Sequence, residues 1–178
     1  RYVLTDGHYG VPGDWMNAMP NLALISNYGV GYDAIDVDLS VSRGILVTHT
    51  PQVLNDEVAT TALMLMLASY RNFLASDAYV RAGRWPEEGQ MTLSRSADNR
   101  RVGILGLGRI GLALARKLEP FNADIAYHNR TPRDVPYRYY DDLAKMAAAC
   151  EVLFVVTPGG ADTRGIVNRK VLDALGAE

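Results

Sequence analysis

The chain has 178 residues, of which 48% are hydrophobic and 21% charged, and its formal net charge at pH 7 is −2. This composition is typical of a globular protein with one domain or two small ones, and the charge excludes a strongly basic surface for nucleic acid. The single cysteine excludes an internal disulfide and fits a reducing compartment. The longest apolar run, at residues 62–68, is too short to cross a bilayer, so we expect a cytoplasmic protein without membrane or nucleic-acid partners.

Short apolar runs alternate with helix-length segments along the whole chain. The runs that predict strands are residues 2–5, 22–27, 44–49, 101–106, 124–128 and 151–156. Such alternation is typical of strand–helix–strand units, so we expect an α/β fold with parallel sheets. Residues 83–100 are polar and lack an apolar period, which predicts a connecting loop between two α/β layers.

A glycine-rich turn, NYGVGYDAID at residues 27–36, directly follows the second predicted strand. Two glycines flank Val30, so backbone N–H groups at this turn can face a small anion such as a carboxylate. Spacing alone equally favours a turn into a helix that is capped by Asp33 or Asp36. These carboxylates and Asp38 have no histidine or glutamate nearby, and we expect no metal site here.

Residues 55–83 predict one long helix. Asn55 and Asp56 can cap its start, and Gly83 suits its end. Its middle, TTALMLMLA at residues 60–68, is apolar on every side. Such a helix is buried all round, by its own domain, by a partner subunit or by both.

A Gly-x-Gly-x-x-Gly motif is formed by Gly106, Gly108 and Gly111. The motif alone is weak, but here a predicted strand leads into it and an apolar-periodic helix and a second strand follow. In this context Gly106 permits a tight turn, Gly108 leaves space for a pyrophosphate, and Gly111 lets helix and strand pack closely. The helix N-terminus then offers free N–H groups to phosphates, which predicts a dinucleotide site. The alternative is a glycine turn without a ligand.

The strand after this motif ends without the acidic residue that binds the ribose hydroxyl of NAD. Instead the chain offers His128, Asn129 and Arg130, with Arg133 close by. The missing acid removes repulsion of a 2′-phosphate, and amide and guanidinium donors suit that group. We therefore expect NADP(H) to be preferred and NAD(H) to bind more weakly. The alternative is that these are solvated loop residues.

The last predicted strand leads into Thr157 and Pro158, where the carboxyl end of a parallel strand meets the ligand crevice. Thr157 and Thr163 are candidates to bind cofactor or substrate. A Pro-Gly turn with a helix cap at Asp162 or Thr163 is equally consistent with the spacing.

Four stretches together resemble the D-isomer-specific 2-hydroxyacid dehydrogenases, and within them the NADPH-preferring glyoxylate and hydroxypyruvate reductase branch. They are residues 27–51, 55–72, 81–85 and 101–132. The resemblance implies three parts: an incomplete flavodoxin-like substrate domain at 1–54, a linking helix and loop at 55–92, and an incomplete Rossmann domain at 93–178. It also implies a small 2-keto or 2-hydroxy acid substrate and a homodimer built through the long helix and the dinucleotide domain.

The same resemblance implies roles for individual residues. The backbone N–H groups of Val30 and Gly31 bind the substrate carboxylate. The residues expected to surround the cofactor are Gly106, Leu107, Gly108, Arg109, Ile110, Gly111, Asn129, Arg130, Thr131, Thr157, Pro158 and Thr163. Among these, residues 107–110 hold the pyrophosphate, residues 129–131 the 2′-phosphate, and the last three line the cleft.

The family's catalytic Arg, Glu and His follow the segment RKVLDALGAE at residues 169–178. None of the three histidines stands at the catalytic position, and the family has a further strand and helix before residue 1. We therefore expect a piece truncated at both ends, with no catalytic residue of its own and inactive alone.

Three alternatives remain. A non-enzymatic NAD(P)-binding corepressor-like or sensing protein shares this fold, and a dehydrogenase of formate, phosphonate or 3-phosphoglycerate shares the scaffold. A methyltransferase that binds S-adenosylmethionine is disfavoured, because Gly111 and the N-terminal half fit the dehydrogenase pattern.

Overall fold

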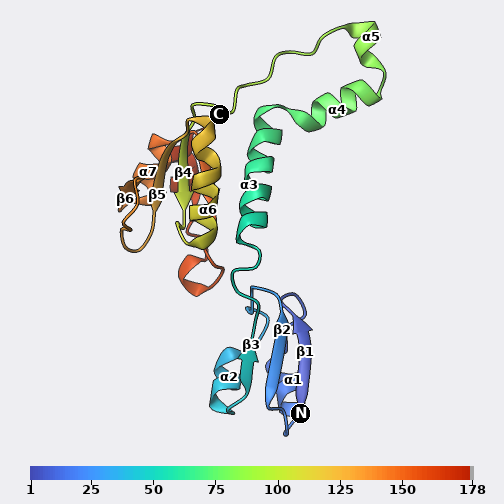
Figure 1. Cartoon of the computed structure of the whole chain (residues 1–178), viewed down its shortest axis with the longest axis vertical. Helices are drawn as coiled ribbons and strands as arrows, with labels where there is room; N and C mark the ends of the chain where they lie inside the picture. Colours follow the sequence, from blue (N-terminus) through green and yellow to red (C-terminus); the bar gives the residue numbers. More distant parts are fainter. Residues whose placement is uncertain (177–178) are drawn as a thin grey trace. The chain divides into compact units, whose positions relative to one another are not determined.

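The computed structural model describes residues 1–176, which divide into two compact units (Figure 1). Unit 1 comprises Arg1–Leu54 and Gly159–Arg164; unit 2 comprises Asn55–Pro158 and the residues from Gly165 on. Across the described part of the chain, no single helix has the length and apolarity to span a membrane. Two helices of unit 2 meet those criteria only as a pair, with a bend of 62° between them.

Unit 1 is built on a three-stranded parallel sheet of order β1-β2-β3. Its elements are β1 Tyr2–Asp6, α1 Gly13–Ala18, β2 Leu24–Tyr28, α2 Val37–Ser42, β3 Leu46–Thr48 and the short 3₁₀ turn η2 Ala161–Thr163. The register aligns Val3, Ile25 and Val47 on one face, where they pack with Met16 of α1 and Leu39 of α2. Because successive strand residues alternate between faces, Tyr2, Leu4 and Leu46 fall on the opposite face and are exposed.

Unit 2 is built on a four-stranded parallel sheet of order β6-β5-β4-β7. Its strands are β4 Arg101–Leu105, β5 Asp124–His128, β6 Arg138–Tyr140 and β7 Val152–Val155. Its helices are α3 Asn55–Tyr70, α4 Phe73–Arg81, α5 Arg84–Glu88, α6 Arg109–Leu118, η1 Glu119–Phe121, α7 Leu143–Ala149 and α8 Arg169–Leu175. The chain order reverses between β4 and β7, and in such sheets ligands bind outside the carboxyl ends of the strands at that point.

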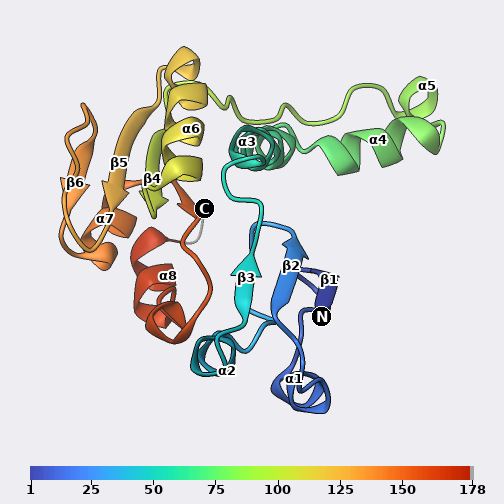
Figure 2. The same ribbon diagram turned by 60° about the horizontal axis from the view of Figure 1, so that its bottom comes forward.

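Helices cover both faces of this sheet (Figure 2). Val102 and Ile104 of β4 and Tyr127 of β5 pack on the side of α3 and α6, whereas Leu105 and Ala126 pack with α7 and α8. Strands that are buried on both faces are typical of a doubly wound parallel sheet. The α/β fold with parallel sheets and a Rossmann-type unit, expected from the sequence, is confirmed.

The long helix expected at residues 55–83 is wrong as a single element. It breaks after Tyr70 because Asn72 adopts the left-handed conformation (φ 49°), and α4 leaves at 62° to α3. Gly83 (φ 69°) follows the end of α4 and precedes α5, a short helix inside the segment that the sequence predicted as a loop.

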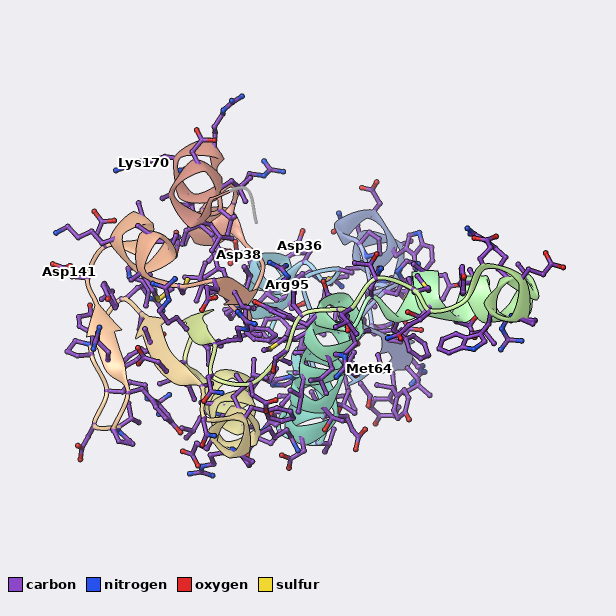
Figure 3. The ribbon with its side chains drawn as sticks, turned by 90° about the horizontal axis from the view of Figure 1, so that it is seen from above. Asp36, Asp38, Met64, Arg95, Asp141 and Lys170 are labelled. Atoms are coloured by element: carbon purple, nitrogen blue, oxygen red, sulfur yellow. The ribbon has the colours of Figure 1, made fainter. Side chains whose placement is uncertain are left out.

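Helix α3 is covered by the rest of unit 2 on one side only. Ala59, Met66 and Tyr70 are buried, but Met64 and Leu65 are 55% and 60% exposed (Figure 3). Packing of α3 along α6 accounts for the buried side. The sequence left open whether its own domain, a partner subunit or both cover α3: its own unit covers the side along α6, and burial of the other side by a partner stays a prediction.

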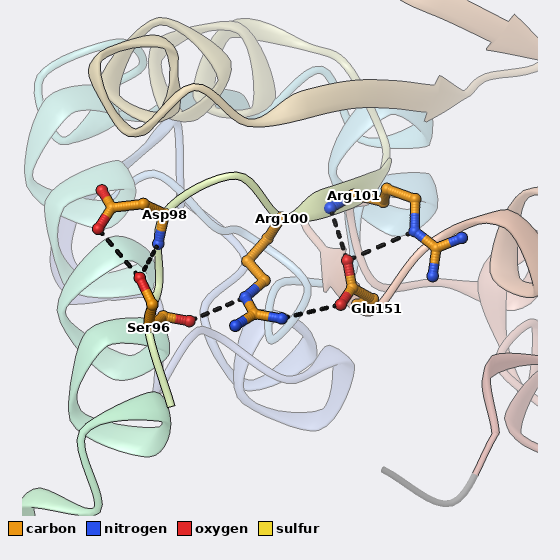
Figure 4. Close-up of polar contacts among 5 residues, drawn as sticks. All are labelled: Ser96, Asp98, Arg100, Arg101 and Glu151. Carbon is orange, nitrogen blue, oxygen red and sulfur yellow. Dashed lines mark hydrogen bonds and ion pairs between the residues drawn. The ribbon is translucent and has the colours of Figure 1, made fainter. Parts of the chain in front are cut away.

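A polar network fixes the approach to β4 (Figure 4). Glu151 accepts a hydrogen bond from the Arg101 backbone N–H at 3.0 Å and pairs with the Arg100 guanidinium, also at 3.0 Å. The backbone bond from Arg101 is the largest cause that lowers the pKa of Glu151, and the Arg100 side chain adds to it. Arg100 in turn donates to the Ser96 carbonyl oxygen at 2.8 Å. The end of the connecting segment is thus tied to the start of β7.

Candidate functional site

The glycine motif makes a tight turn between β4 and α6. Gly106 has φ 99°, and a Cβ added there would lie 2.9 Å from Thr157 Cγ2. A Cβ on Gly111 would collide with the carbonyl oxygen of Gly106. These two glycines therefore have the turn and close-packing roles expected from sequence. At Gly108 an added Cβ would meet no atom within 4 Å, so the space beside it is open.

The N-terminus of α6 opens at this turn. The Leu112 N–H donates to the carbonyl oxygen of the N-cap residue Gly108 at 2.9 Å. Within residues 1–176, the N–H groups of Gly108, Arg109 and Ile110 donate to no acceptor outside or before the helix. Free N–H groups and the positive helix dipole suit a phosphate, and the open side of Gly108 gives it room.

The backbone N–H and carbonyl of Leu107 both form hydrogen bonds within the protein. Its N–H donates to Asn129 Oδ1 at 2.8 Å, and its carbonyl oxygen accepts from Arg133 Nη1 at 2.6 Å. The side chain is fully buried. The sequence analysis placed Leu107 among the residues that hold the pyrophosphate, and this stays a prediction; in the structure its backbone joins the glycine turn to the loop after β5.

Further hydrogen bonds hold the loop after β5. The Tyr127 hydroxyl accepts from Arg133 N–H at 2.7 Å, and the Tyr139 hydroxyl donates to the Asn129 carbonyl oxygen at 3.2 Å. His128 Nδ1 lies 2.8 Å from the Tyr140 carbonyl oxygen. With Asn129 turned toward Leu107, the exposed polar residues that follow it are Arg130, Thr131, Arg133 and Asp134. Two arginines and one aspartate thus lie in the loop after the carboxyl end of β5.

The segment after β7 has two parts that belong to different units. Thr157 and Pro158 are the last residues of the first stretch of unit 2, which resumes at Gly165, and Thr157 packs against the Gly106 turn. Thr163 lies in η2 of unit 1, where its hydroxyl donates to the Gly160 carbonyl oxygen at 3.4 Å. A helix cap at Asp162 or Thr163 is wrong, because α8 begins later and is capped by Asn168, whose Oδ1 accepts from Val171 N–H at 3.2 Å.

In unit 1 the turn after β2 presents two N–H groups. Among the described residues, neither Val30 N–H nor Gly31 N–H donates to an acceptor. Asp36, and not Asp33, caps α2 by accepting from Leu39 N–H at 3.0 Å. The sequence analysis missed Asn27, which is 2% exposed and bonds to this turn. An asparagine inside an apolar strand was the only signal for it.

Other ionisable groups have structural surroundings. Asp6, at the end of β1, accepts from the N–H groups of Tyr9 and His8, and these bonds lower its pKa. Burial raises the pKa of the Cys150 thiol, so it is no ready nucleophile. In the part of the chain that the structure describes, no three His, Cys, Asp or Glu side chains gather closely enough to hold a metal ion.

Known proteins resemble both units. The model of the D-isomer specific 2-hydroxyacid dehydrogenase NAD binding domain matches residues 63–178. Glyoxylate/hydroxypyruvate reductase A of Arabidopsis thaliana is 40% identical over 179 residues, which cover 100% of this chain and 57% of that protein. The 2-ketogluconate reductase of Gluconobacter oxydans shows the same identity and coverage.

Among solved structures, the NADPH-dependent glyoxylate/hydroxypyruvate reductase of Sinorhizobium meliloti, in complex with NADP and malonate, is 46% identical with a TM-score of 0.92. The match covers 98% of this chain and 55% of that one. The chain thus spans a little over half the length of the relatives that it matches.

Proposed function

Because this chain belongs to the D-isomer-specific 2-hydroxyacid dehydrogenases, we propose that it is part of an NAD(P)H-dependent reductase of small 2-keto acids, of the glyoxylate or hydroxypyruvate type. In this proposal residues 1–54 belong to the substrate domain and residues 93–178 form the domain that binds the dinucleotide. Residues 55–92 are the helix and loop that link the two domains. The observation that carries it is the glycine turn of unit 2, where free N–H groups of α6 meet open space beside Gly108.

The residues of unit 2 fit a dinucleotide. The N–H groups of Gly108, Arg109 and Ile110 would hold the pyrophosphate, because they point out of the helix start without acceptors of their own. Gly106 and Gly111 shape this turn, and Leu107 fixes it through Asn129 and Arg133. When bound, the nicotinamide supplies the hydride.

The loop after β5 supports a preference for NADP(H). It has no carboxylate at residues 128–133, and Arg130, Thr131 and Arg133 are exposed there. Guanidinium groups bind phosphate oxygens well, whereas an acidic residue here would repel the 2′-phosphate. Asn129 supports the site indirectly, since its side-chain oxygen is bonded to Leu107. Thr157 and Pro158 complete this side, and Thr163 is a further candidate.

Unit 1 supplies a grip for the substrate. The N–H groups of Val30 and Gly31 would bind its carboxylate, as unpaired backbone donors in a turn do for small anions. Reduction of the keto group also needs a cation at the carbonyl and an acid that protonates the alkoxide. The resemblance places the residues that supply this cation and this acid beyond residue 178. We therefore propose that the 178-residue chain binds the dinucleotide and the keto acid but does not catalyse the reduction.

The exposed side of α3 supports a homodimer. Met64 and Leu65 of α3, and Phe73 and Leu74 of α4, are each more than half exposed. Several large apolar side chains exposed along neighbouring helices favour an interaction site, and a second copy of the same helices would cover them.

The test is steady-state kinetics of the protein expressed from its complete gene, with NADPH or NADH against glyoxylate, hydroxypyruvate, formate and 3-phosphoglycerate. The proposal predicts reduction of glyoxylate or hydroxypyruvate with NADPH. Cofactor binding without turnover of any substrate would contradict it and favour a sensing or corepressor-like protein. Turnover of formate or 3-phosphoglycerate alone would keep the scaffold but overturn the substrate class.

A further inference from the structure

The turn Gly29–Gly31 in unit 1 has its carbonyl groups tied to the protein. The Gly29 carbonyl oxygen accepts from Thr50 N–H at 2.9 Å and from Asn27 Nδ2 at 3.2 Å. The Gly31 carbonyl oxygen accepts from the same Asn27 Nδ2 at 2.7 Å. His49 Nδ1 lies 3.0 Å from the Val30 carbonyl oxygen. One buried carboxamide therefore holds the turn at both ends.

The orientation of the Asn27 carboxamide follows from these contacts. Two carbonyl oxygens within hydrogen-bond distance require the nitrogen at that position, because an oxygen there would face both acceptors. Its Oδ1 is then buried without a hydrogen-bond partner among the described residues. A buried polar atom without a partner destabilises a fold. Asn27 is thus a poor residue for stability, and another requirement must keep it here.

Peptide geometry gives that requirement. In a trans peptide the carbonyl of one residue and the N–H of the next point in opposite directions. Tying the Gly29 carbonyl inward therefore turns Val30 N–H outward, and tying the Val30 carbonyl turns Gly31 N–H outward. Neither of these N–H groups donates to an acceptor among residues 1–176. The turn also packs closely against Gly7, the residue after β1, since a Cβ on Gly7 would lie 2.8 Å from the Gly31 carbonyl oxygen.

We propose that Asn27 is a positioning residue for the carboxylate of the substrate: it holds the Gly29 carbonyl, which turns Val30 N–H toward the anion, and the Gly31 carbonyl, which fixes the far end of the turn, while the contact of His49 with the Val30 carbonyl turns Gly31 N–H the same way. Asn27 itself does not touch the substrate. This inference depends on the proposed function, because it takes the turn as the carboxylate site.

The test is an NMR titration of the ¹⁵N-labelled 178-residue chain with sodium glyoxylate, with sodium chloride at equal ionic strength as the reference. In the wild type, the amide signals of Val30 and Gly31 should shift saturably. Asn27→Leu keeps the size of the side chain but removes its hydrogen-bond donor. Asn27→Ala removes the donor and also shortens the side chain. Each variant should bind glyoxylate roughly tenfold more weakly, with unchanged affinity for NADPH.

Ser40→Ala is the matched control. Ser40 is 1% exposed and lies in the same unit, and its hydroxyl donates to the Asp36 carbonyl oxygen and contacts Met16 Sδ. Its loss should lower the melting temperature but leave glyoxylate affinity unchanged. Asn27→Leu should show the reverse pattern, with little change in melting temperature, since it also removes the unpartnered Oδ1.

Wild-type glyoxylate affinity in Asn27→Leu overturns the positioning role and leaves the proposed function intact. Absence of any Val30 or Gly31 shift in the wild type overturns both the positioning role and the substrate site, while the NADPH titration still tests the cofactor site. If neither Asn27 variant folds, the wild type decides: the Asn27 carboxamide protons must exchange slowly with water, and fast exchange overturns the proposal.

Discussion

Two glycines of the same motif meet different surroundings. A side chain at Gly111 would strike the Gly106 carbonyl oxygen and come within 3.3 Å of Ile104 Cγ2, whereas a side chain at Gly108 would meet nothing within 4 Å. The first position is therefore constrained by the fold itself. The second is free in the protein alone, and the constraint that we propose for it comes from the cofactor.

Alanine substitutions separate these roles. Gly111→Ala should lower the free energy of unfolding by about 2 kcal/mol, because a Cβ must be forced into a filled space. Gly108→Ala should change it by less than about 0.5 kcal/mol but weaken NADPH binding at least roughly tenfold. Urea unfolding and calorimetric titration measure the two effects. Normal NADPH binding by a well-folded Gly108→Ala variant would contradict the placement of the pyrophosphate.

Arg130 gives a second contrast at this scale, between the two cofactors. Arg130→Gln should weaken NADPH binding roughly tenfold, since a guanidinium–phosphate contact is a charge-assisted hydrogen bond, and leave NADH binding unchanged. The matched control is Arg164→Gln, which changes the same charge in the other unit. An equal loss for both cofactors would show that Arg130 does not distinguish them.

Glu151 should make the stability depend on pH. Its pKa is lowered in the folded chain, so its contribution is fully present above the unfolded pKa of about 4.3 and is lost as pH falls through the folded value. Glu151→Gln should therefore destabilise by about 1 kcal/mol at pH 7 and by much less near pH 3. Melting curves at both values, with exposed Glu87→Gln as the control, test this. An equal deficit at both values would contradict it.

Side-chain contacts with the backbone set the limit of prediction at the residue scale. The glycine motif was readable because a predicted strand leads into it and an apolar-periodic helix and a second strand follow it. The bonds from Leu107 to Asn129 and Arg133, and from Asn27 to the Gly29–Gly31 turn, join positions whose partners depend on the folded geometry. No local pattern announces such pairs.

Among the elements, α3 shows that an apolar pattern does not tell whether its own unit or a partner subunit covers a helix. Its sequence is apolar on every side, yet its own unit buries only the side that packs along α6. Leu65→Glu should therefore leave the fold intact and shift a dimer of the complete protein to monomer at micromolar concentration, as a charge is then buried without a partner. Light scattering after size-exclusion chromatography measures this.

Val41→Glu, the same change at a 74% exposed position of α2 in unit 1, is the control. A dimer that survives Leu65→Glu would contradict the role of α3. A monomeric wild type would overturn the dimer itself.

The elements that the sequence analysis missed share a physical cause. The strand β6 has three residues, too few to show an alternating pattern, and its place is set by pairing with β5. The break between α3 and α4 depends on Asn72, whose left-handed conformation is compatible with asparagine but is not required by it. The six apolar runs were predicted correctly as strands, since each pairs in one of the two parallel sheets.

For the whole molecule, the two units carry different halves of one proposed reaction. Unit 2 has the turn and cations for the cofactor, and unit 1 has the paired N–H groups for a carboxylate. We therefore expect the 178-residue chain to bind the cofactor and glyoxylate without reducing glyoxylate. Measurable turnover by a chain of verified mass would show that a catalytic group lies within these residues.

The most direct test of the central claim is a calorimetric titration of the 178-residue chain with NADPH and, separately, with NADH. We expect saturable binding of one NADPH per chain, with NADH bound roughly tenfold more weakly for lack of the contact with Arg130. Tighter binding of NADH would contradict the cofactor preference. Failure of the folded chain to bind either dinucleotide at millimolar concentration would contradict the dinucleotide site itself.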